Sequence, residues 1–500
     1  MAQVDAPAQR SREGAHSQRE AALQMLLRRR PESIAGLLRD VGSATAPLRA
    51  CGIALDFSRQ RLNPADLAAL RQVAGECDVI GAHRAMMRGA VVNASEQRAA
   101  LHTALRAPVD DPDAPAQIAQ AVHAELARLR TFARAVRSAE WKGATGQPLT
   151  DVINIGIGGS DSGPRLAVAA LSDGTQELRL HFLSNVDGHG VARLLPQLDP
   201  ARTLAVVSSK SFSTRETLLN ATAVRNWMQA AGIDGGALAQ HVVCVSARDG
   251  AAAELGLPAA NQFRLWDWVG GRFSVWSAIG LPVMLAIGPE RFDEFLAGAH
   301  AMDRHSLDAP LEANLPATLA LLSLWNTLAL RTTSLCLLPY DDRLLAMVTW
   351  LQQLQMESLG KSVSSTGDTL TVAAGEVVWG GVGTDAQHTF FQALRQGSLR
   401  TAIDIVYAAR ADHAYAEHHR SLLANSRAQA EALVAHDAAS QAVNAVSLLQ
   451  LDALTPASLG SLLALYEHKT TMLATLLGIN AFDQPGVELG KQLARDLEAQ

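Results

Sequence analysis

The chain has 500 residues, of which 48% are hydrophobic and 5% aromatic, and its formal net charge is −6. This apolar content suffices for more than one hydrophobic core, so we expect a globular protein of two α/β domains. The acidic balance gives no bulk electrostatic reason to bind nucleic acid or a membrane surface, and a site for a polyanion would have to be local.

Residues 1–110 predict a helical segment, because Leu, Ala and Arg recur at helical spacing and breaks fall at Pro31, Gly42 and Pro64. The sequence changes character near Leu149, where short β-rich runs begin to alternate with helical segments. This alternation is typical of a parallel sheet flanked by helices. The runs cover residues 151–155, 178–183, 203–207, 242–245 and 263–266.

A second alternating block follows and predicts strands at 335–339, 376–379 and 401–406. The last quarter of the chain is helical again, with a long apolar pattern over 458–477 that ends at Gly478. The fold class that follows is α/β, with two doubly wound parallel-sheet units and helical N- and C-terminal segments. We expect the first unit at residues 111–290 and the second at 291–500, with residues 1–110 packing on the second.

The cysteines and the N-terminal residues indicate the cellular compartment of the protein. The four cysteines are far apart and form no CxxC pair, which argues against a zinc site or a disulfide framework and favours a reducing compartment. The first residues are polar and contain no apolar stretch like that of a signal peptide, and no later segment stays apolar long enough to span a bilayer. We therefore expect a cytoplasmic protein with no nucleic-acid or membrane partner.

The first loop with chemical content, here called the glycine loop, covers residues 156–164 between a strand and a helix. Its glycines let the backbone approach a ligand, and the helix N-terminus favours an anion. Asp161 stands where GxGxxG needs its third glycine, and Gly163 precedes Pro164 where a P-loop needs Lys, so a nucleotide site is disfavoured. A tight turn without any ligand is an equal alternative for this loop taken alone.

A second loop, here called the hydroxyl loop, covers residues 208–217 and contains the sequence SSKSFSTRET. Several hydroxyls, Lys210 and the free N–H groups of a new helix can enclose a phosphoryl group at the C-terminal end of a parallel strand. The alternative is that these Ser and Thr residues are caps and turn formers. Capping uses one or two hydroxyls, so the surplus favours a phosphate site.

Eight stretches carry a resemblance to the phosphoglucose isomerase family along nearly the whole chain. They occur in the family's order, at residues 156–161, 184–188, 209–214, 267–282, 356–358, 383–388, 465–469 and 486–491. The resemblance implies a homodimer of two sugar-isomerase (SIS-type) domains, each an α/β/α sandwich. It also implies interconversion of glucose 6-phosphate and fructose 6-phosphate in glycolysis and gluconeogenesis. The reaction would proceed through ring opening and a cis-enediol(ate), without a metal or cofactor.

The same resemblance implies roles for individual residues. Glu357 matches the general base that carries a proton between C1 and C2 of the opened sugar, and Arg272 matches the arginine that stabilises the enediolate. His388 and Lys491 match the pair that opens the ring, with His388 supplied by the neighbouring subunit and paired with Glu216. The other residues implied to bind the substrate are Gly158, Gly159, Ser160, Ser209, Lys210, Ser211, Thr214, Gln353 and Gln484.

Several positions depart from the family's pattern, and Ser211 and Ser213 among them keep the hydroxyl of the more common Thr. Gly381 replaces a Glu and Asp385 replaces an Asn in the loop before His388, so one carboxylate is lost and another appears nearby. Leu359 replaces an Asn, and Pro485 replaces a Trp. We expect activity to survive these changes, with altered affinity or stability.

Taken singly, the candidate residues also fit simpler roles. Glu357 could be a solvated carboxylate, Arg272 a structural ion pair, Lys491 a surface lysine and His388 a hydrogen-bonded core histidine. Their occurrence together favours catalysis. A separate cluster resembles metal-ligand spacing only loosely, and we assign it a solvated or packing role. It consists of His413, Glu417, His418 and His419.

Two other functions are alternatives to the isomerase. A different sugar-phosphate isomerase or an amino-transferring enzyme of the same domain type would carry a glutaminase domain or an N-terminal cysteine nucleophile, and neither is present. A non-catalytic sugar-phosphate sensor would lack Glu357 or Arg272 and would usually carry a DNA-binding module. The presence of the carboxylate, the arginine and Lys491 favours the enzyme.

Overall fold

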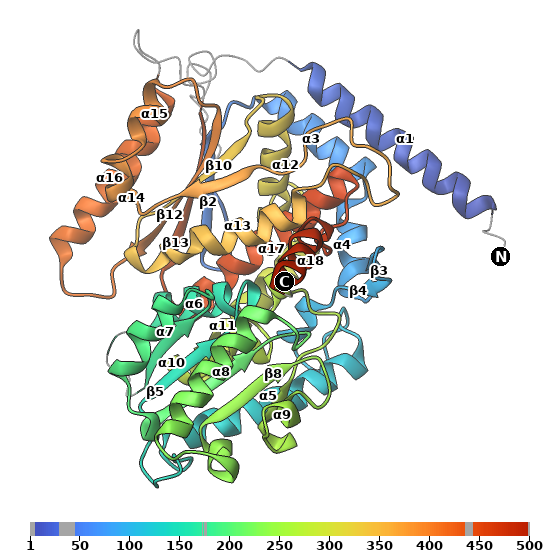
Figure 1. Ribbon diagram of the computed structural model, residues 1–500. Coiled ribbons are helices and arrows are strands. Elements are labelled where there is room, and N and C mark those ends of the chain that lie inside the picture. Colours follow the sequence, from blue (N-terminus) through green and yellow to red (C-terminus); the bar gives the residue numbers. More distant parts are fainter. Residues whose placement is uncertain (1–5, 30–45, 173, 175–177, 436–443, 499–500) are drawn as a thin grey trace.

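The computed structural model describes residues 6–29, 46–172, 174, 178–435 and 444–498. It has two α/β lobes, each built around its own sheet (Figure 1). The helices α13 (Ala346–Leu359) and α17 (Pro456–Leu477) lie where the two lobes meet, and both contact helix α6 (Gly159–Leu171). The predicted fold class, α/β with two doubly wound units, is confirmed.

The first sheet consists of five strands in the order β6-β5-β7-β8-β9, and every neighbouring pair is parallel. Its strands are β5 (Asp151–Ile155), β6 (Arg179–Leu183), β7 (Thr203–Ser208), β8 (Val242–Ser246) and β9 (Gln262–Arg264). The strands β5, β7 and β8 are buried along their whole length, which explains their unbroken apolar sequences. Helix α6 follows β5, and helix α8 (Arg215–Ala230) follows β7.

The second sheet has six strands in the order β1-β2-β13-β12-β10-β11. They are β1 (Leu48–Ala50), β2 (Ile53–Arg59), β10 (Ser334–Pro339), β11 (Val377–Gly380), β12 (Thr401–Arg410) and β13 (Ala445–Ala453). Strands β10 to β13 pair in parallel, whereas β2 joins β13 antiparallel and β1 closes a hairpin with β2.

Two parts of this sheet were predicted to be helical. The N-terminal segment does hold helices α1 (Ala6–Arg28), α3 (Pro64–Glu76) and α4 (Val79–Met87), but strands β1 and β2 lie between them. The alternation of buried Ile53, Leu55 and Phe57 was a strand signal. Strand β13 lies in the last quarter, where a short, mostly apolar run fits a buried strand and a buried helix equally well.

Helix α17 packs against helix α11 (Pro289–Asp308) at backbone contact distance. A Cβ added at Gly298 would lie 1.9 Å from the carbonyl oxygen of Ala457, and one added at Gly460 would lie 2.0 Å from that of Phe295. Only glycine allows this approach. The helix begins at a capping box in which Thr455 and Ser458 exchange hydrogen bonds, and it ends at Gly478 with φ +70°.

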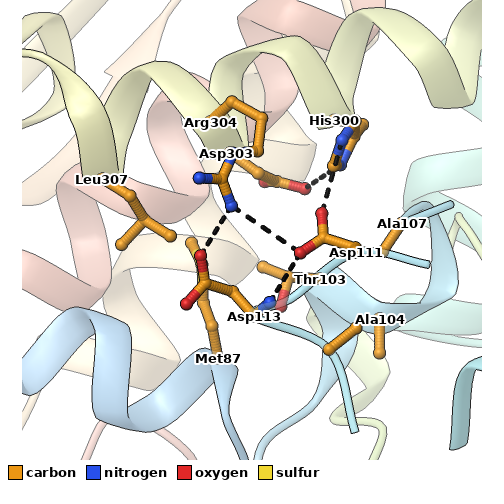
Figure 2. A pocket seen from close by; sticks show the side chains of 11 residues that line it. Met87, Thr103, Ala104, Ala107, Asp111, Asp113, His300, Asp303, Arg304 and Leu307 are labelled. Atoms are coloured by element: carbon orange, nitrogen blue, oxygen red, sulfur yellow. Dashed lines mark hydrogen bonds and ion pairs between the residues drawn. The ribbon is translucent and has the colours of Figure 1, made fainter. Parts of the chain in front are cut away.

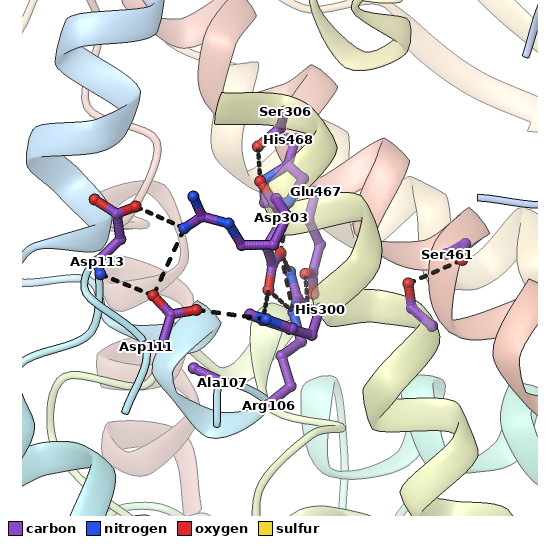
Figure 3. A network of polar contacts seen from close by, with 12 residues as sticks. Arg106, Ala107, Asp111, Asp113, His300, Asp303, Ser306, Ser461, Glu467 and His468 are labelled. Atoms are coloured by element: carbon purple, nitrogen blue, oxygen red, sulfur yellow. Dashed lines mark hydrogen bonds and ion pairs between the residues drawn. The ribbon is translucent and has the colours of Figure 1, made fainter. Parts of the chain in front are cut away.

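A buried polar network ties α17 and α11 to the loop that follows the short 3₁₀ helix η1 (His102–Leu105) (Figure 3). The guanidinium of Arg106 donates to Asp303 at 2.6 Å and to Glu467 at 2.6 Å. His468 contacts the same Asp303 carboxylate at 2.7 Å, and the Trp276 indole donates to Glu467 at 2.8 Å. One buried cation therefore serves two buried carboxylates.

The two carboxylates differ in their proton affinity. Arg106 and His468 outweigh burial at Asp303 and lower its pKa, whereas burial dominates at Glu467 and raises its pKa to about 7. Folded Glu467 therefore holds a proton that the unfolded chain releases near pH 4.5. Its contribution to stability falls as the pH rises from about 4.5 to 7.

We expect the free energy of unfolding of Glu467→Gln, relative to that of wild type, to increase by on the order of 2 kcal/mol as the pH rises through this window. Urea unfolding of variant and wild type at pH 5, 6, 7 and 8 measures the difference. Subtracting the wild-type curve of stability against pH from that of the variant removes the opposing effect of His83 and His468, because burial lowers the pKa of both histidines in both proteins. The exposed Glu417→Gln is the control and should give a flat difference, and a flat difference for Glu467→Gln would contradict the prediction.

A small cavity lies beside this network, bordered by Asp111, Asp113, His300 and Arg304 (Figure 2). Arg304 lies 2.6 Å from Asp113 and 3.6 Å from Asp111, so its charge is matched within the wall of the cavity. The volume is about 10 Å³, which is space for about one water molecule. This cavity is too small for a substrate.

Candidate active site

The glycine loop packs directly on two other candidate segments. Gly158 has φ +61°, and a Cβ added there would lie 3.0 Å from the Nε2 atom of Gln353 on α13. A Cβ at Gly159 would lie 2.0 Å from the carbonyl oxygen of Gly271, in the 3₁₀ turn η6 (Gly271–Phe273) that carries Arg272. The glycines therefore serve close contacts between parts of the protein chain as well as access for a ligand.

Because the Gly159 contact is backbone to backbone, no side chain can move aside for an added methyl group. We expect Gly159→Ala to cost about 1–3 kcal/mol of stability and to lower the catalytic rate by displacing Arg272. Thermal unfolding and the isomerisation rate measure the two effects. Gly188→Ala is the control, because nothing lies within 4 Å of a Cβ there. Equal behaviour of the two variants would refute the contact.

Glu357 lies in the last turn of α13, and both of its carboxylate oxygens are engaged. Oε2 accepts from Nη1 of Arg272 at 3.0 Å, and Oε1 accepts from Nε2 of Gln353 at 3.3 Å. Gln353 is itself oriented by Ser162, whose hydroxyl donates to its Oε1 at 2.9 Å. The carboxylate keeps 32% of its side chain exposed, so it is fixed in direction and still accessible.

Arg272 is buried, and each of its five N–H groups has an acceptor. Nε donates to Ser358 at 2.7 Å, and Nη1 donates to Glu357 and also to Gln484 at 2.8 Å. Nη2 donates to the carbonyl oxygens of Ala481 and Asp483. Burial lowers the pKa of Arg272 and Glu357 opposes that shift, and a guanidinium remains charged in any case. The result is a positive charge held rigidly beside a carboxylate.

The hydroxyl loop connects β7 to α8 and turns on Phe212, which is buried and has φ +52°. Ser209 and Thr214 are hydrogen-bonded at 3.2 Å. Ser211 and Ser213 are paired at 2.8 Å. Thr214 is the N-cap residue of α8 but makes no side-chain cap bond. Its hydroxyl therefore does not cap the helix, as the alternative interpretation of this loop required.

The amine of Lys210 is hydrogen-bonded to the protein backbone, which a role in phosphate binding alone would not predict. Nζ donates to the carbonyl oxygens of Asp267 at 2.7 Å and Val269 at 2.8 Å, in the segment just before Arg272. Burial lowers the pKa of this amine. Lys210 thus joins the hydroxyl loop to the arginine loop and has one N–H left for a ligand.

Three predicted residues are not brought to the carboxylate within this chain. His388 is the exposed C-cap residue of the short helix α14 (Gly383–Gln387). Glu216 lies in the first turn of α8. Lys491 is on helix α18 (Glu488–Glu498), is 59% exposed and pairs with Glu488 at 2.7 Å. Direct contacts thus join the glycine loop, Gln353, Glu357, Arg272 and Gln484, and among the described residues no hydrogen bond or ion pair joins the ring-opening residues to this group.

Some functional contacts were missed by sequence reasoning. Ser162 and Ser358 hold Gln353 and Arg272, and Ser358 stands next to Glu357 in a stretch already singled out. Lys361 forms an ion pair with Asp483 at 2.7 Å, which fastens the segment that supplies acceptors to Arg272. No local pattern announces a pair 122 residues apart.

A carboxylate beside a fixed guanidinium, packed against the glycine loop at the carboxyl edge of a parallel sheet, fits an α/β isomerase of the sugar-phosphate type. Comparison with known families agrees, because residues 56–500 match phosphoglucose isomerase. The chain belongs to the phosphoglucose isomerase family.

Individual relatives are similar over most of their length. A glucose-6-phosphate isomerase of Burkholderia lata is 48% identical over 470 residues, which cover 90% of this chain and 86% of the relative. One of Burkholderia multivorans is 47% identical over 468 residues, with the same coverage. The crystal structure of a glucose-6-phosphate isomerase from Chlamydia trachomatis is 33% identical and superposes with a TM-score of 0.86 over 96% of this chain and 94% of that one.

Two absences hold for the described part of the chain. None of its helices is long and apolar enough to cross a membrane. The described residues also contain no group of three or more His, Cys, Asp or Glu arranged to hold a metal ion, and this includes the cluster around His418.

Proposed function

We propose that the chain interconverts D-glucose 6-phosphate and D-fructose 6-phosphate in glycolysis and gluconeogenesis. The observation that carries the proposal is the placement of the Glu357 carboxylate 3.0 Å from the buried guanidinium of Arg272. Proton transfer between adjacent carbons needs one base to remove and return the proton and one fixed positive charge to stabilise the oxyanion. The names of the relatives support the choice of substrate.

In the proposed reaction, the sugar ring opens and the phosphate group binds at the hydroxyl loop. Glu357 removes the proton from C2 of the open-chain aldose, and the electrons of that C–H bond form the C1=C2 double bond while O1 becomes negatively charged. Arg272 stabilises this enediol(ate). Glu357 then returns the proton to C1, the proton of the C2 hydroxyl passes to the negatively charged O1, and a ketone forms at C2.

One experiment tests the overall reaction. The purified protein is incubated with fructose 6-phosphate in deuterated water containing a chelator. We expect glucose 6-phosphate with deuterium at C2, because a proton held by Glu357 exchanges with solvent before it is returned. Absence of product would overturn the proposed function, and product that disappears with the chelator would overturn metal-free proton transfer.

We further propose that the active form is a cytoplasmic homodimer in which His388 of one chain completes the site of the other and pairs with Glu216. The exposure of His388, which makes no hydrogen bond or ion pair with Glu357 among the described residues, supports this arrangement. Lys491 would be the second ring-opening residue, and this role requires its amine to leave Glu488.

Mixing two inactive variants tests the shared site. His388→Ala and Glu357→Gln would each be nearly inactive alone. In a mixed dimer, one site carries both defects and the other carries neither. Random re-association of equal amounts should therefore restore about a quarter of wild-type activity. If His388 acts within its own chain, mixing restores nothing. The subunits are re-associated by unfolding and refolding the mixture. His388→Ala alone, taken through the same step, is the control.

A further inference from the structure

Three of the groups that accept hydrogen bonds from Arg272 come from one short segment, residues 481–484, here called the acceptor turn. They are the carbonyl oxygens of Ala481 and Asp483 and the side-chain oxygen of Gln484. The turn lies between α17 and α18 and belongs to no helix or strand. The direction of its carbonyl groups, and therefore the orientation of the guanidinium, depends on the contacts that hold the turn in place.

The carboxylate of Asp483 binds the acceptor turn to two other parts of the chain. Oδ1 accepts from Nζ of Lys361 at 2.7 Å, and Oδ2 accepts from Oγ of Ser95 at 2.6 Å and from Nδ2 of Asn480 at 2.8 Å. Burial tends to raise the pKa of Asp483, but its bonds to Lys361 and Ser95 outweigh burial and lower this pKa. The carboxylate is therefore charged at neutral pH.

One of these two parts is the end of α13. Lys361 follows Gly360, the C-cap residue of α13, and lies four residues after Glu357. Its ion pair with Asp483 therefore joins the segment that carries the proposed base to the turn that orients the guanidinium. The side chains of the pair are only 10% and 16% exposed, so water and salt screen this pair less than an ion pair on the surface.

The other part is a hairpin in the N-terminal segment, formed by β3 (Val91–Asn93) and β4 (Arg98–Ala99) (Figure 1). The tip of the hairpin supplies Ser95, and the side chain of the buried Asn93 accepts from Nδ2 of Asn480 at 3.0 Å. None of the predicted site residues lies in this segment. The hairpin nevertheless holds the residues that surround the guanidinium.

We propose that Asp483 is a positioning residue for the proposed isomerisation: Lys361 and Ser95 hold its carboxylate, and its acceptor turn sets the orientation of Arg272. Stabilisation of an oxyanion depends on preorganised donors, and a displacement of about 1 Å costs on the order of a hundredfold in rate. The role rests on the proposed function, because it requires Arg272 to stabilise the enediol(ate). It concerns the transition state and not the phosphate group, which the hydroxyl loop would bind.

Steady-state kinetics with fructose 6-phosphate test this role. Asp483→Ala should lower the turnover number about ten- to a hundredfold and change the KM less than about threefold. Asp483→Asn keeps an oxygen for Lys361 and gains an amide that can donate to Ser95, so it should recover most of the lost turnover. Asp249→Ala is the matched control, because it removes an 86% exposed aspartate paired with Arg264 and should leave both constants unchanged.

A second background tests whether Asp483 acts through Arg272. In Arg272→Lys, the carbonyl groups of the acceptor turn no longer hold a guanidinium, so adding Asp483→Ala should lower the remaining turnover less than about threefold. A residue that only stabilises the fold would cost the same factor in both backgrounds. Ser95→Ala removes one exposed hydroxyl and should lower turnover about two- to fivefold in a folded protein.

Circular dichroism at the assay temperature establishes the folded fraction of each variant. Wild-type turnover in folded Asp483→Ala, or an equal loss in the two backgrounds, would overturn the positioning role. Should Asp483→Ala not fold, unchanged turnover of Ser95→Ala would overturn it. An inactive wild type would overturn the proposed function and this role with it, whereas an active wild type with an equally active Asp483→Ala would overturn this role alone.

Discussion

Glu357→Gln is expected to lower the turnover number of isomerisation by a factor of about 10²–10⁴, because an amide cannot accept and return the proton. The KM for fructose 6-phosphate should change little, since in the proposed function the phosphate group binds at the hydroxyl loop. The fold should also be kept, because the amide oxygen still accepts from Arg272 and Gln353 still lies one turn away. Deuterium exchange at the substrate carbon and steady-state rates measure the effect.

The adjacent Met356→Gln serves as the matched control, because it introduces the same amide on the same helix turn at a position that is 39% exposed. It should keep near-wild-type turnover. A Glu357→Gln variant that continues to exchange deuterium at the wild-type rate would assign the base to another residue. A large rise in KM at unchanged turnover would instead make Glu357 a binding residue.

Arg106→Met is expected to produce the largest loss of stability, about 3–5 kcal/mol. The substitution keeps much of the side-chain volume and leaves the buried carboxylates of Asp303 and Glu467 without their shared cation. The free energy of unfolding in urea at pH 7.5 measures this loss. The active-site residues do not contact Arg106, so any folded fraction should retain its KM.

The control for this variant is Arg134→Met, which breaks the exposed pair with Glu290 and should cost at most about 1 kcal/mol. The loss at Arg106 should shrink at pH 5, where Glu467 takes up a proton and no longer needs a counter-charge. A cost at Arg106 equal to that at Arg134 would mean that the buried carboxylates are neutral in the folded protein.

The sequence predicted those parts of the site whose chemistry lies in contiguous stretches. Glu357 is one helical turn after Gln353, and Arg272 follows two glycines, so their residue types and order were visible without a structure. The sequence only partly explained why a glycine is required at position 159. Its glycine pattern suggested access for a ligand, whereas the structure adds a backbone contact with Gly271, 112 positions away.

Other features depend on packing that no local pattern encodes. Strands β2 and β13 pair with each other although nearly the whole chain separates them in sequence. Each is short enough to resemble its helical neighbours in sequence. The two bonds of Lys210 to backbone carbonyl oxygens could not be foreseen, because carbonyl positions depend on the fold and not on residue type. The pairing of Lys491 with Glu488 is local, but the exposure of the helix that carries it is set by tertiary structure.

The dispersed origin of the acceptors around Arg272 has a consequence for protein synthesis. Glu357 lies 85 residues after the arginine, and Gln484 lies 212 residues after it. A growing polypeptide on the ribosome can fold its first sheet early, yet its guanidinium stays incompletely bound until residue 484 has left the exit tunnel. If Arg272 acts as proposed, catalytic competence is acquired only when translation is almost finished, and we expect prematurely terminated products to be inactive even where their first lobe is native.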